Sequence, residues 1–276
     1  LTVYVGIEKP GAVRNLKSVE DLNKEGLIHV TWDAPLGLHG GYIDPAGLTY
    51  YISIGSSSED VSLGNNNYYD EQLNIKSKQE YTGYSVYAVN SSGGGREQWQ
   101  TVTAIAGPAL KAPMIESFKN CTMKSGPWIT NMTNGEIGDA YCYAATESTV
   151  TLAQDNDGGL QTFSATAVGK SVRSESPKVD IKNMKSPVLN FWAYLNGDGD
   201  ELNISVQKDY GEFVDVRRIS TAEGTKGWNR FSIDLTPYKD FKFLRIGFEG
   251  KAVKNLDNFV AYDNVAIVEK MSLIHT

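Results

Sequence analysis

Histidine and cysteine are scarce in this chain: its 276 residues include three histidines and two cysteines. Two cysteines are too few for a disulfide-rich scaffold or a cysteine-based zinc fold. No run of about 18 apolar residues occurs, so no transmembrane segment is expected. The 26 Lys and Arg residues against 33 Asp and Glu residues give a net charge of -7. Nucleic acid favours a basic surface, so we expect no nucleic-acid partner.

The residues that are abundant favour β-structure. The chain has 27 glycines and 15 tyrosines, and segment 27–32 (Leu-Ile-His-Val-Thr-Trp) alternates apolar and polar positions as a half-buried strand does. No segment shows a convincing apolar period of 3.6 residues. Short strands separated by Gly- and Asn-rich turns predict an all-β sandwich or barrel. We expect strands at 27–32, 50–54, 84–89 and 100–105, and at 149–152, 188–195, 202–207, 213–219, 229–235, 243–248 and 259–268.

A proline-flanked segment divides the chain into two domains. Residues 107–113 (Gly-Pro-Ala-Leu-Lys-Ala-Pro) contain two prolines, which disfavour helix and strand pairing. We therefore expect a first domain over residues 11–107, a linker over 108–113, a second domain over 114–269 and a tail over 270–276. Residues 2–10 and 101–108 share a strand-then-Gly-then-Pro form. This suggests that residues 1–8 are either the last strand of a preceding domain or an N-terminal extension.

Two segments of the first domain resemble the fibronectin type III family. Residues 30–35 (Val-Thr-Trp-Asp-Ala-Pro) match its B strand, and residues 84–95, from Tyr-Ser-Val-Tyr to Gly-Gly-Gly, match its F strand and F–G turn. The resemblance implies an immunoglobulin-like sandwich. Trp32 is expected in its core.

The second domain resembles the jelly-roll family of MAM domains, cleaved-adhesin domains and choice-of-anchor modules. Six motif pieces occur in the family's order over about 150 residues. They are 115–118 with 126–128, 169–181, 189–194, 228–238, 243–249 and 261–267. The resemblance implies a larger jelly-roll β-sandwich with Trp128 and Trp228 in its core.

The two resemblances together imply a segment of a modular bacterial surface protein, secreted or displayed on the cell surface. Its expected function is non-catalytic recognition or adhesion, with a glycan or an extracellular protein as the partner of the jelly roll and the first domain as spacer. A monomer or weak oligomer is expected. Two alternatives are a structural stalk of a larger secreted enzyme and a hydrolase in its own right.

The hydrolase alternative lacks a recognisable nucleophilic site. Such catalysis needs a base beside a Ser or Cys. His29 is expected to face solvent, His39 lies in a glycine loop and His275 is near the end of the chain, and no Gly-x-Ser-x-Gly motif occurs. No catalytic residue is therefore predicted.

Four acidic residues could hold a structural Ca²⁺ in the second domain. Asp155 and Asp157 place hard oxygen donors on a tight turn, as Ca²⁺ requires. The jelly-roll resemblance adds Glu116 from the first strand and Asp263 from the last. The alternative is an Asx-rich turn and a surface carboxylate, since Asn and Asp favour turns.

Four aromatic residues are candidates for ligand binding, because a ring offers a flat apolar face on which sugars or partner side chains can stack. Trp192 and Tyr194 share one face of the strand at 188–195, where packed core is the alternative. Trp99 follows a glycine turn, and Tyr42 lies in a glycine-rich loop. Both are expected to be exposed.

The two cysteines lie 21 residues apart in the second domain, at Cys121 and Cys142. In a secreted protein they could form a disulfide. Two small buried thiols are the alternative.

Overall fold

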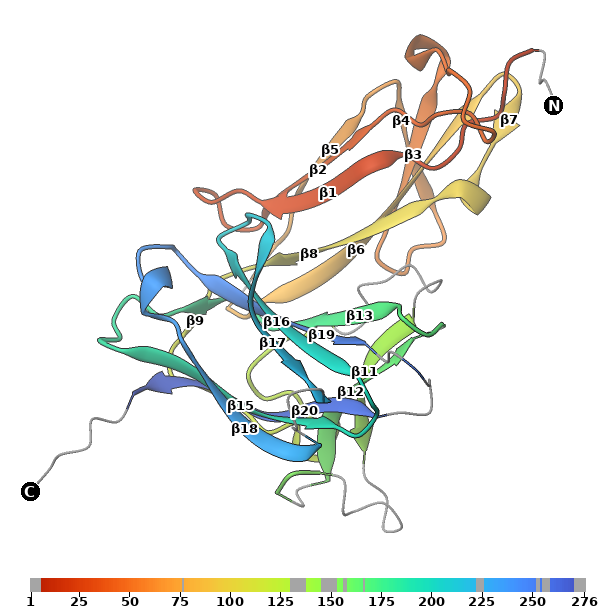
Figure 1. Ribbon diagram of the computed structural model, residues 1–276. Helices are drawn as coiled ribbons and strands as arrows, with labels where there is room; N and C mark the ends of the chain where they lie inside the picture. Colours follow the sequence, from red (N-terminus) through yellow and green to blue (C-terminus); the bar gives the residue numbers. More distant parts are fainter. Residues whose placement is uncertain are drawn as a thin grey trace, which may run out of the picture. The chain divides into compact units, whose positions relative to one another are not determined.

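The chain folds into two compact units, and the boundary between them along the sequence falls between Gly107 and Pro108. The computed structural model in Figure 1 describes residues 6–75, 77–129, 138–144, 153–155, 158–165, 167–221, 226–251, 254 and 259–270. Within these ranges strands and short 3-10 turns are the regular structure, so the all-β prediction is confirmed. Among the described residues, none of the helices is long and apolar enough to span a membrane.

The first unit is a sandwich of two antiparallel sheets. One sheet has the order β1-β2-β5, and the other has the order β4-β3-β6-β7 with β8 also paired to β6. The strands are β1 (Arg14–Glu20), β2 (Leu27–Asp33), β3 (Thr49–Ile54), β4 (Asp60–Gly64), β5 (Tyr68–Gln72), β6 (Glu80–Asn90), β7 (Gly93–Gly94) and β8 (Gln100–Ala106). Two 3-10 turns, η1 (Pro45–Gly47) and η2 (Arg96–Gln98), connect them.

The core of the first unit forms where the apolar positions of the two sheets face each other. Ile28, Val30 and Trp32 alternate along β2 and are buried, as the sequence predicts. They pack with residues of the second sheet, including Tyr50, whose ring centroid lies 5.5 Å from that of Trp32 in an edge-on contact. Alternation along a strand thus places every second residue in the core.

The second unit is a larger sandwich of two six-stranded sheets. One sheet has the order β11-β12-β20-β15-β18 with β10 also on β20. The other has the order β17-β16-β19-β14-β9 with β13 also on β19. The strands are β9 (Leu110–Lys111), β10 (Met114–Glu116), β11 (Gly138–Ala144), β12 (Gly159–Ala165), β13 (Ser171–Glu175), β14 (Val179–Asp180), β15 (Pro187–Leu195), β16 (Glu201–Lys208), β17 (Phe213–Ser220), β18 (Gly227–Asp234), β19 (Leu244–Lys251) and β20 (Val260–Glu269). The 3-10 turns are η3 (Lys119–Cys121) and η5 (Thr236–Tyr238). The strand expected at 149–152 lies outside the described residues.

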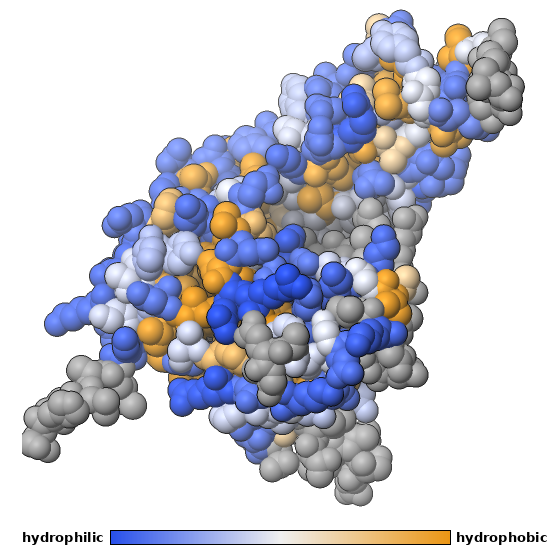
Figure 2. Space-filling view, viewed as in Figure 1, coloured by the Kyte–Doolittle hydropathy of each residue, from blue (hydrophilic) through white to orange (hydrophobic). Residues whose placement is uncertain are grey.

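The core of the second unit takes alternate residues from both sheets. Leu202, Ile204 and Val206 of β16 point inward, and Leu189 and Phe191 of β15 meet them from the other sheet. The intervening residues of each strand face outward. On the face shown in Figure 2, hydrophilic residues dominate, with smaller hydrophobic groups between them. The outward positions of the sheets are therefore where a binding surface can form.

Ile7 and Glu8 are hydrogen-bonded to other parts of the first unit. Residues 6–8 form no strand. The carbonyl oxygens of Ile7 and Glu8 accept hydrogen bonds from Ser92 Oγ (2.7 Å) and Asn90 Nδ2 (2.7 Å). The Glu8 carboxylate accepts one from the His39 backbone N–H at 3.1 Å. Which of the two alternatives holds for residues 1–8 stays a prediction.

The proline-flanked segment is more ordered than the sequence predicts. Its residues Leu110–Lys111 form β9 and pair in parallel with β14. The Leu110 and Ala112 N–H groups donate to Lys178 O (2.9 Å) and Asp180 O (3.0 Å). Pro108 and Pro113 lie on either side of this short pairing. The residues between them keep their backbone N–H groups, and these donate the hydrogen bonds to β14.

His29 gives the first unit a pH-dependent contribution to stability. Its Nδ1 lies 2.8 Å from Asp70 Oδ1 and its Nε2 lies 3.4 Å from Asp21 Oδ2. The hydrogen bond to Asp70 is the main reason that the pKa of His29 is raised above its usual value. A raised folded pKa means that the stabilisation is fully present below the unfolded pKa, about 6.5, and is lost as pH rises through the folded value.

We expect the melting temperature of the first unit to fall between pH 6 and pH 8 by more in the natural protein than in His29→Gln. Thermal melts across that pH range measure the difference, and an NMR titration of the imidazole gives its pKa directly. Equal pH slopes in the two proteins would contradict the role of His29.

Candidate functional site

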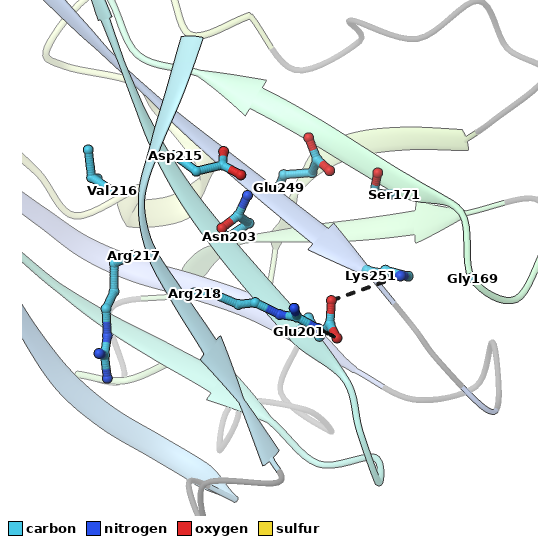
Figure 3. Close-up of a pocket in the computed structure, with 10 residues that line it drawn as sticks. All are labelled: Gly169, Ser171, Glu201, Asn203, Asp215, Val216, Arg217, Arg218, Glu249 and Lys251. Carbon is cyan, nitrogen blue, oxygen red and sulfur yellow. Dashed lines mark hydrogen bonds and ion pairs between the residues drawn. The ribbon is translucent and has the colours of Figure 1, made fainter.

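A polar groove crosses the outward face of the second sheet of the second unit. Its volume is about 440 Å³, and it is drawn in Figure 3. Strands β16, β17 and β19 carry most of its lining, and the residues before and at the start of β13 complete it. The lining residues are Gly169, Ser171, Glu201, Asn203, Asp215, Val216, Arg217, Arg218, Glu249 and Lys251.

Strand register explains why these residues meet. Asn203 on β16 lies opposite Arg218 on β17 and opposite Glu249 on β19. Glu201, two residues earlier on β16, lies opposite Lys251 on β19. Residues two apart on one strand share a face, and directly paired residues on neighbouring strands do so too. The five side chains therefore share the outward face.

A third row brings Asp215 to the same face. Ser205 on β16 lies opposite Asp215 on β17 and Gly247 on β19. Pairing between β16 and β17 shifts by one residue between Ile204 and Ser205, which marks a β-bulge. Because of this shift, Asp215 and Arg218 face the groove although they are three residues apart.

One end of the groove holds its cations in ion pairs. Glu201 lies between Arg218, which contacts its Oε1, and Lys251, whose Nζ is 3.9 Å from its Oε2. In Figure 3 these three side chains form a chain along one side of the groove, whereas Arg217 points away from it. Two positive charges thus face a single carboxylate at this end.

Four other polar side chains of the groove have no partner. Among the described residues, the side chains of Ser171, Asn203, Asp215 and Glu249 make no hydrogen bond or ion pair. Figure 3 shows the Asp215 side chain directed toward Asn203, with Glu249 on the far side of Asn203. These groups offer a ligand two carboxylates, one amide and one hydroxyl.

A buried charge cluster lies on the same outward face, beyond the groove. Arg245 is 5% exposed and Glu175 is 1% exposed, and Nη2 of the arginine lies 2.6 Å from Oε2 of the glutamate. Arg173 Nε donates to the other oxygen of Glu175 at 3.0 Å. The Phe213 ring covers both guanidinium groups, with centroid distances of 4.6 Å to Arg173 and 5.7 Å to Arg245. Burial lowers the pKa of Arg245, and the Glu175 carboxylate opposes that change.

Gly247 fits beneath the Phe213 ring because it has no side chain. A Cβ at this position would lie 2.5 Å from Ser205 Oγ and 3.1 Å from Phe213 Cδ1. The absent side chain lets the ring settle against the sheet. The cluster therefore holds β13, β17 and β19 together beside the groove.

The predicted aromatic ligand residues do not reach this groove. Trp192 and Tyr194 are half-buried on the outward face of the other sheet, where the Tyr194 ring meets Trp228 at 5.4 Å and Phe259 at 5.8 Å. Trp99 and Tyr42 belong to the first unit and are 48% and 81% exposed. Their exposure agrees with the sequence, and their binding role stays a prediction.

The predicted calcium ligands lie around a bulge in β20. Asp263 is fully buried and accepts hydrogen bonds from the backbone N–H groups of Gln154 (3.0 Å) and Asn264 (2.7 Å). Asp155 accepts one from Asn264 Nδ2 at 3.1 Å. Glu116, also buried, accepts from the Phe118 N–H and from Ser125. Asp157 lies outside the described residues.

The same region contains an unsatisfied donor and acceptor. Gln161 is fully buried, and neither polar atom of its side chain has a partner. It lies opposite Tyr262, and Glu116 lies opposite Val265. Strand β15 pairs with one edge of β20. Strands β10 and β12 therefore pair one after the other along its other edge, on either side of Asp263.

Calcium stays a prediction for this region. Ca²⁺ takes six to eight oxygen ligands from carboxylates, amides and carbonyls. The carboxylates of Glu116 and Asp263 and the orphaned amide of Gln161 fit that preference. In the described part of the chain, no group of three or more acidic, His or Cys side chains is close enough to hold a metal.

If calcium binds here, EDTA is expected to lower the melting temperature of the second unit. Saturation at about 100 times Kd is worth about 2.7 kcal/mol, or about 5–10 °C for a domain of this size. Asp263→Ala should melt lower and lose the calcium response, whereas Asp240→Asn, at an exposed turn, should keep it. Identical melts of the natural protein in calcium and in EDTA would refute the site.

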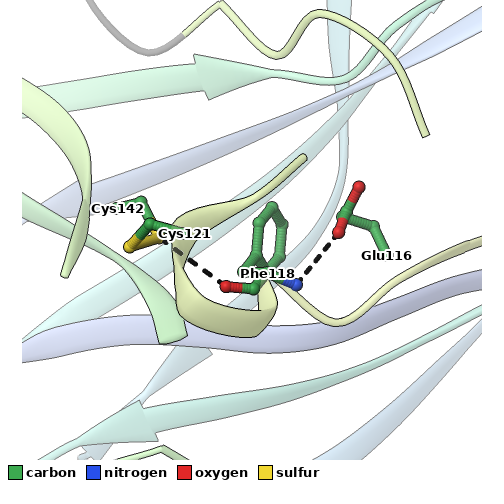
Figure 4. Close-up of a disulfide and its surroundings, with 4 residues drawn as sticks. All are labelled: Glu116, Phe118, Cys121 and Cys142. Carbon is green, nitrogen blue, oxygen red and sulfur yellow. Dashed lines mark hydrogen bonds between the residues drawn. A yellow bond between two sulfur atoms is a disulfide. The ribbon is translucent and has the colours of Figure 1, made fainter. Parts of the chain in front are cut away.

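Cys121 and Cys142 are bonded in the structure, the first of the two alternatives (Figure 4). Their Cα atoms are 5.5 Å apart, and the bond joins η3 to β11. Next to it, the Phe118 N–H donates to Glu116 Oε1 at 3.0 Å, and the Phe118 ring packs edge-on against Trp128 in the core. The turn after β10 is thus fixed in three ways: by the disulfide to β11, by the hydrogen bond to Glu116 and by packing of Phe118 in the core.

No protein-family model and no curated protein sequence matches this chain. Solved structures of similar shape include TmCBM61 in complex with beta-1,4-galactotriose (14% identity, TM-score 0.40, covering 56% of this chain and 94% of that one). Another is the K1 cleaved adhesin domain of Lys-gingipain from Porphyromonas gingivalis (16% identity, TM-score 0.42, covering 58% of this chain and 99% of that one). A third is a xylan-binding domain from CBM 22 (10% identity, TM-score 0.38, covering 58% of this chain and 96% of that one). At these identities and TM-scores the similarity assigns no function.

Proposed function

We propose that the second unit is a non-catalytic recognition module that binds a glycan in the groove. The observation that carries this proposal is the set of four unpartnered polar side chains, Ser171, Asn203, Asp215 and Glu249, gathered on one face of a sheet. Polar groups held in place on rigid strands lose little entropy when a ligand binds.

The side chains of the groove suit the hydroxyl groups of a sugar. A hydroxyl both donates and accepts, a carboxylate accepts at two oxygens, and an amide does both. Hydrogen bonds to charged groups contribute about 1.5–3 kcal/mol, roughly twice the value for neutral pairs. A glycan could therefore bond with Asn203, Asp215 and Glu249 together.

The first unit serves in this proposal as a spacer that presents the second. The module would act at a bacterial cell surface or outside the cell, either as an adhesin or as the accessory region of a larger secreted enzyme. An extracellular protein is the alternative partner. Trp99 and Tyr42 are the side chains of the first unit that we expect to touch such a partner.

Titration of the protein against a panel of plant, bacterial and host glycans tests the proposal. Asn203→Ala and Glu249→Ala are each expected to weaken the binding of a positive glycan at least tenfold, because each removes hydrogen bonds worth more than about 1.4 kcal/mol. Trp192→Ala, on the other sheet, is the control and should bind as the natural protein does.

Three results would overturn the assignment. Absence of saturable binding to every glycan favours the structural stalk. Loss of binding in Trp192→Ala with normal binding in Asn203→Ala moves the site to the aromatic face. Release of shortened sugars during the titration identifies a hydrolase.

A further inference from the structure

We infer that Asp215 and Glu249 restrict the groove to uncharged glycans and exclude those that carry carboxylate or sulfate groups. This inference rests on the proposed function and names the ligand class of the same site. The groove has charged groups of both signs, so selectivity depends on which charges are already paired.

Three carboxylates and three cations line the groove, but only one of the carboxylates, Glu201, is paired with a cation of the groove. Arg218 and Lys251 both contact Glu201, and Arg217 points away from the groove. Asp215 and Glu249, in contrast, pair with no cation among the described residues. Arg173, which lies opposite Glu249 across β13 and β19, donates to Glu175 and is thereby committed to another carboxylate.

Hydrogen-bonding capacity leads to the same selectivity. An ionised carboxylate only accepts hydrogen bonds, so Asp215 and Glu249 need donors from the ligand. Sugar hydroxyls are donors. A uronate or sulfate group in their place is another acceptor of the same charge, and like charges in contact oppose binding.

The test uses matched pairs of polysaccharides that differ in charge. The pairs are xylan with glucuronoxylan, hydroxyethyl cellulose with carboxymethyl cellulose, and methyl-esterified with de-esterified homogalacturonan. In every pair that binds, we expect the neutral member to bind at least tenfold more tightly in low salt, and the ratio to shrink as sodium chloride is added.

Charge-neutral variants then locate the origin of the selectivity. Asp215→Asn with Glu249→Gln keeps the size of both side chains and is expected to reduce the ratio to less than threefold. Asp240→Asn removes one carboxylate from an exposed turn of the same unit and should leave the ratio unchanged, which controls for loss of a negative charge outside the groove.

The outcomes separate this inference from the function on which it rests. Equal binding of neutral and charged members, or an equal effect of Asp240→Asn, overturns the charge inference and leaves glycan binding intact. If none of the six polysaccharides binds and the wider glycan panel is also negative, glycan recognition itself fails. Preference for the acidic members contradicts the inference directly.

Discussion

Replacing Arg245 with leucine is expected to destabilise the second unit by about 3–5 kcal/mol. The guanidinium lies 2.6 Å from Glu175 Oε2, and the substitution leaves that buried oxygen without its partner, while Arg173 still donates to Oε1. It also removes the hydrogen bond from Arg245 Nε to the Ser176 carbonyl at 3.1 Å. Urea unfolding followed by tryptophan fluorescence measures the loss.

The double variant separates the lost ion pair from lost packing. Arg245→Leu combined with Glu175→Leu removes both charges, and apolar pairs often replace buried ion pairs at little or no cost. We expect the double variant to recover most of the stability that the single variant loses. A double variant no more stable than Arg245→Leu would mean that the charge pair is not the reason for the loss.

Removal of the disulfide is the second large effect. Cys121→Ser with Cys142→Ser is expected to cost about 3 kcal/mol, because the bond closes a loop of about 20 residues in the unfolded chain. For a domain of this size that corresponds to a drop of about 6–12 °C in melting temperature. Thermal melts of the oxidised protein and the double variant measure it.

Thiol titration provides the chemical control for this prediction. The purified protein, denatured without reductant, should show no free thiol. The double serine variant and the natural protein treated with reductant should melt together. Two free thiols in the untreated protein would contradict the bond.

Alternation along single strands made the sandwich cores predictable from the sequence. Trp32 is buried as its alternation predicts, and Trp128 is buried as the jelly-roll resemblance implies. Trp228 was expected in the core, but it lies half-buried on the outward face of β18 and packs against Tyr194. The strand at 188–195 is apolar at most positions of both faces, so a large aromatic residue on the neighbouring strand can pack on either face. The two-residue alternation of apolar positions therefore does not tell which face is the core.

The groove could not be predicted in the same way, because its residues come together only through strand pairing. Ser171, Asn203 and Glu249 are far apart in the chain and meet because β13, β16 and β19 are neighbours in register. Moving the pairing by one residue would turn each side chain to the core. The local signal was the alternation of polar positions 201, 203, 205 and 207 along β16, which marks an outward face but does not reveal its neighbours.

The central position of Asn203 has a consequence for how the protein is produced. Asn203 begins the tripeptide Asn203-Ile204-Ser205, the acceptor sequence for N-linked glycosylation. In a eukaryotic secretory pathway the enzyme that attaches these chains can reach the tripeptide before β16 takes its place in the sheet. The modified protein would carry a covalent oligosaccharide at the middle of its own groove. Secretion into the periplasm of a bacterium keeps that side chain unmodified and the groove open to added ligands, and it allows the disulfide to form.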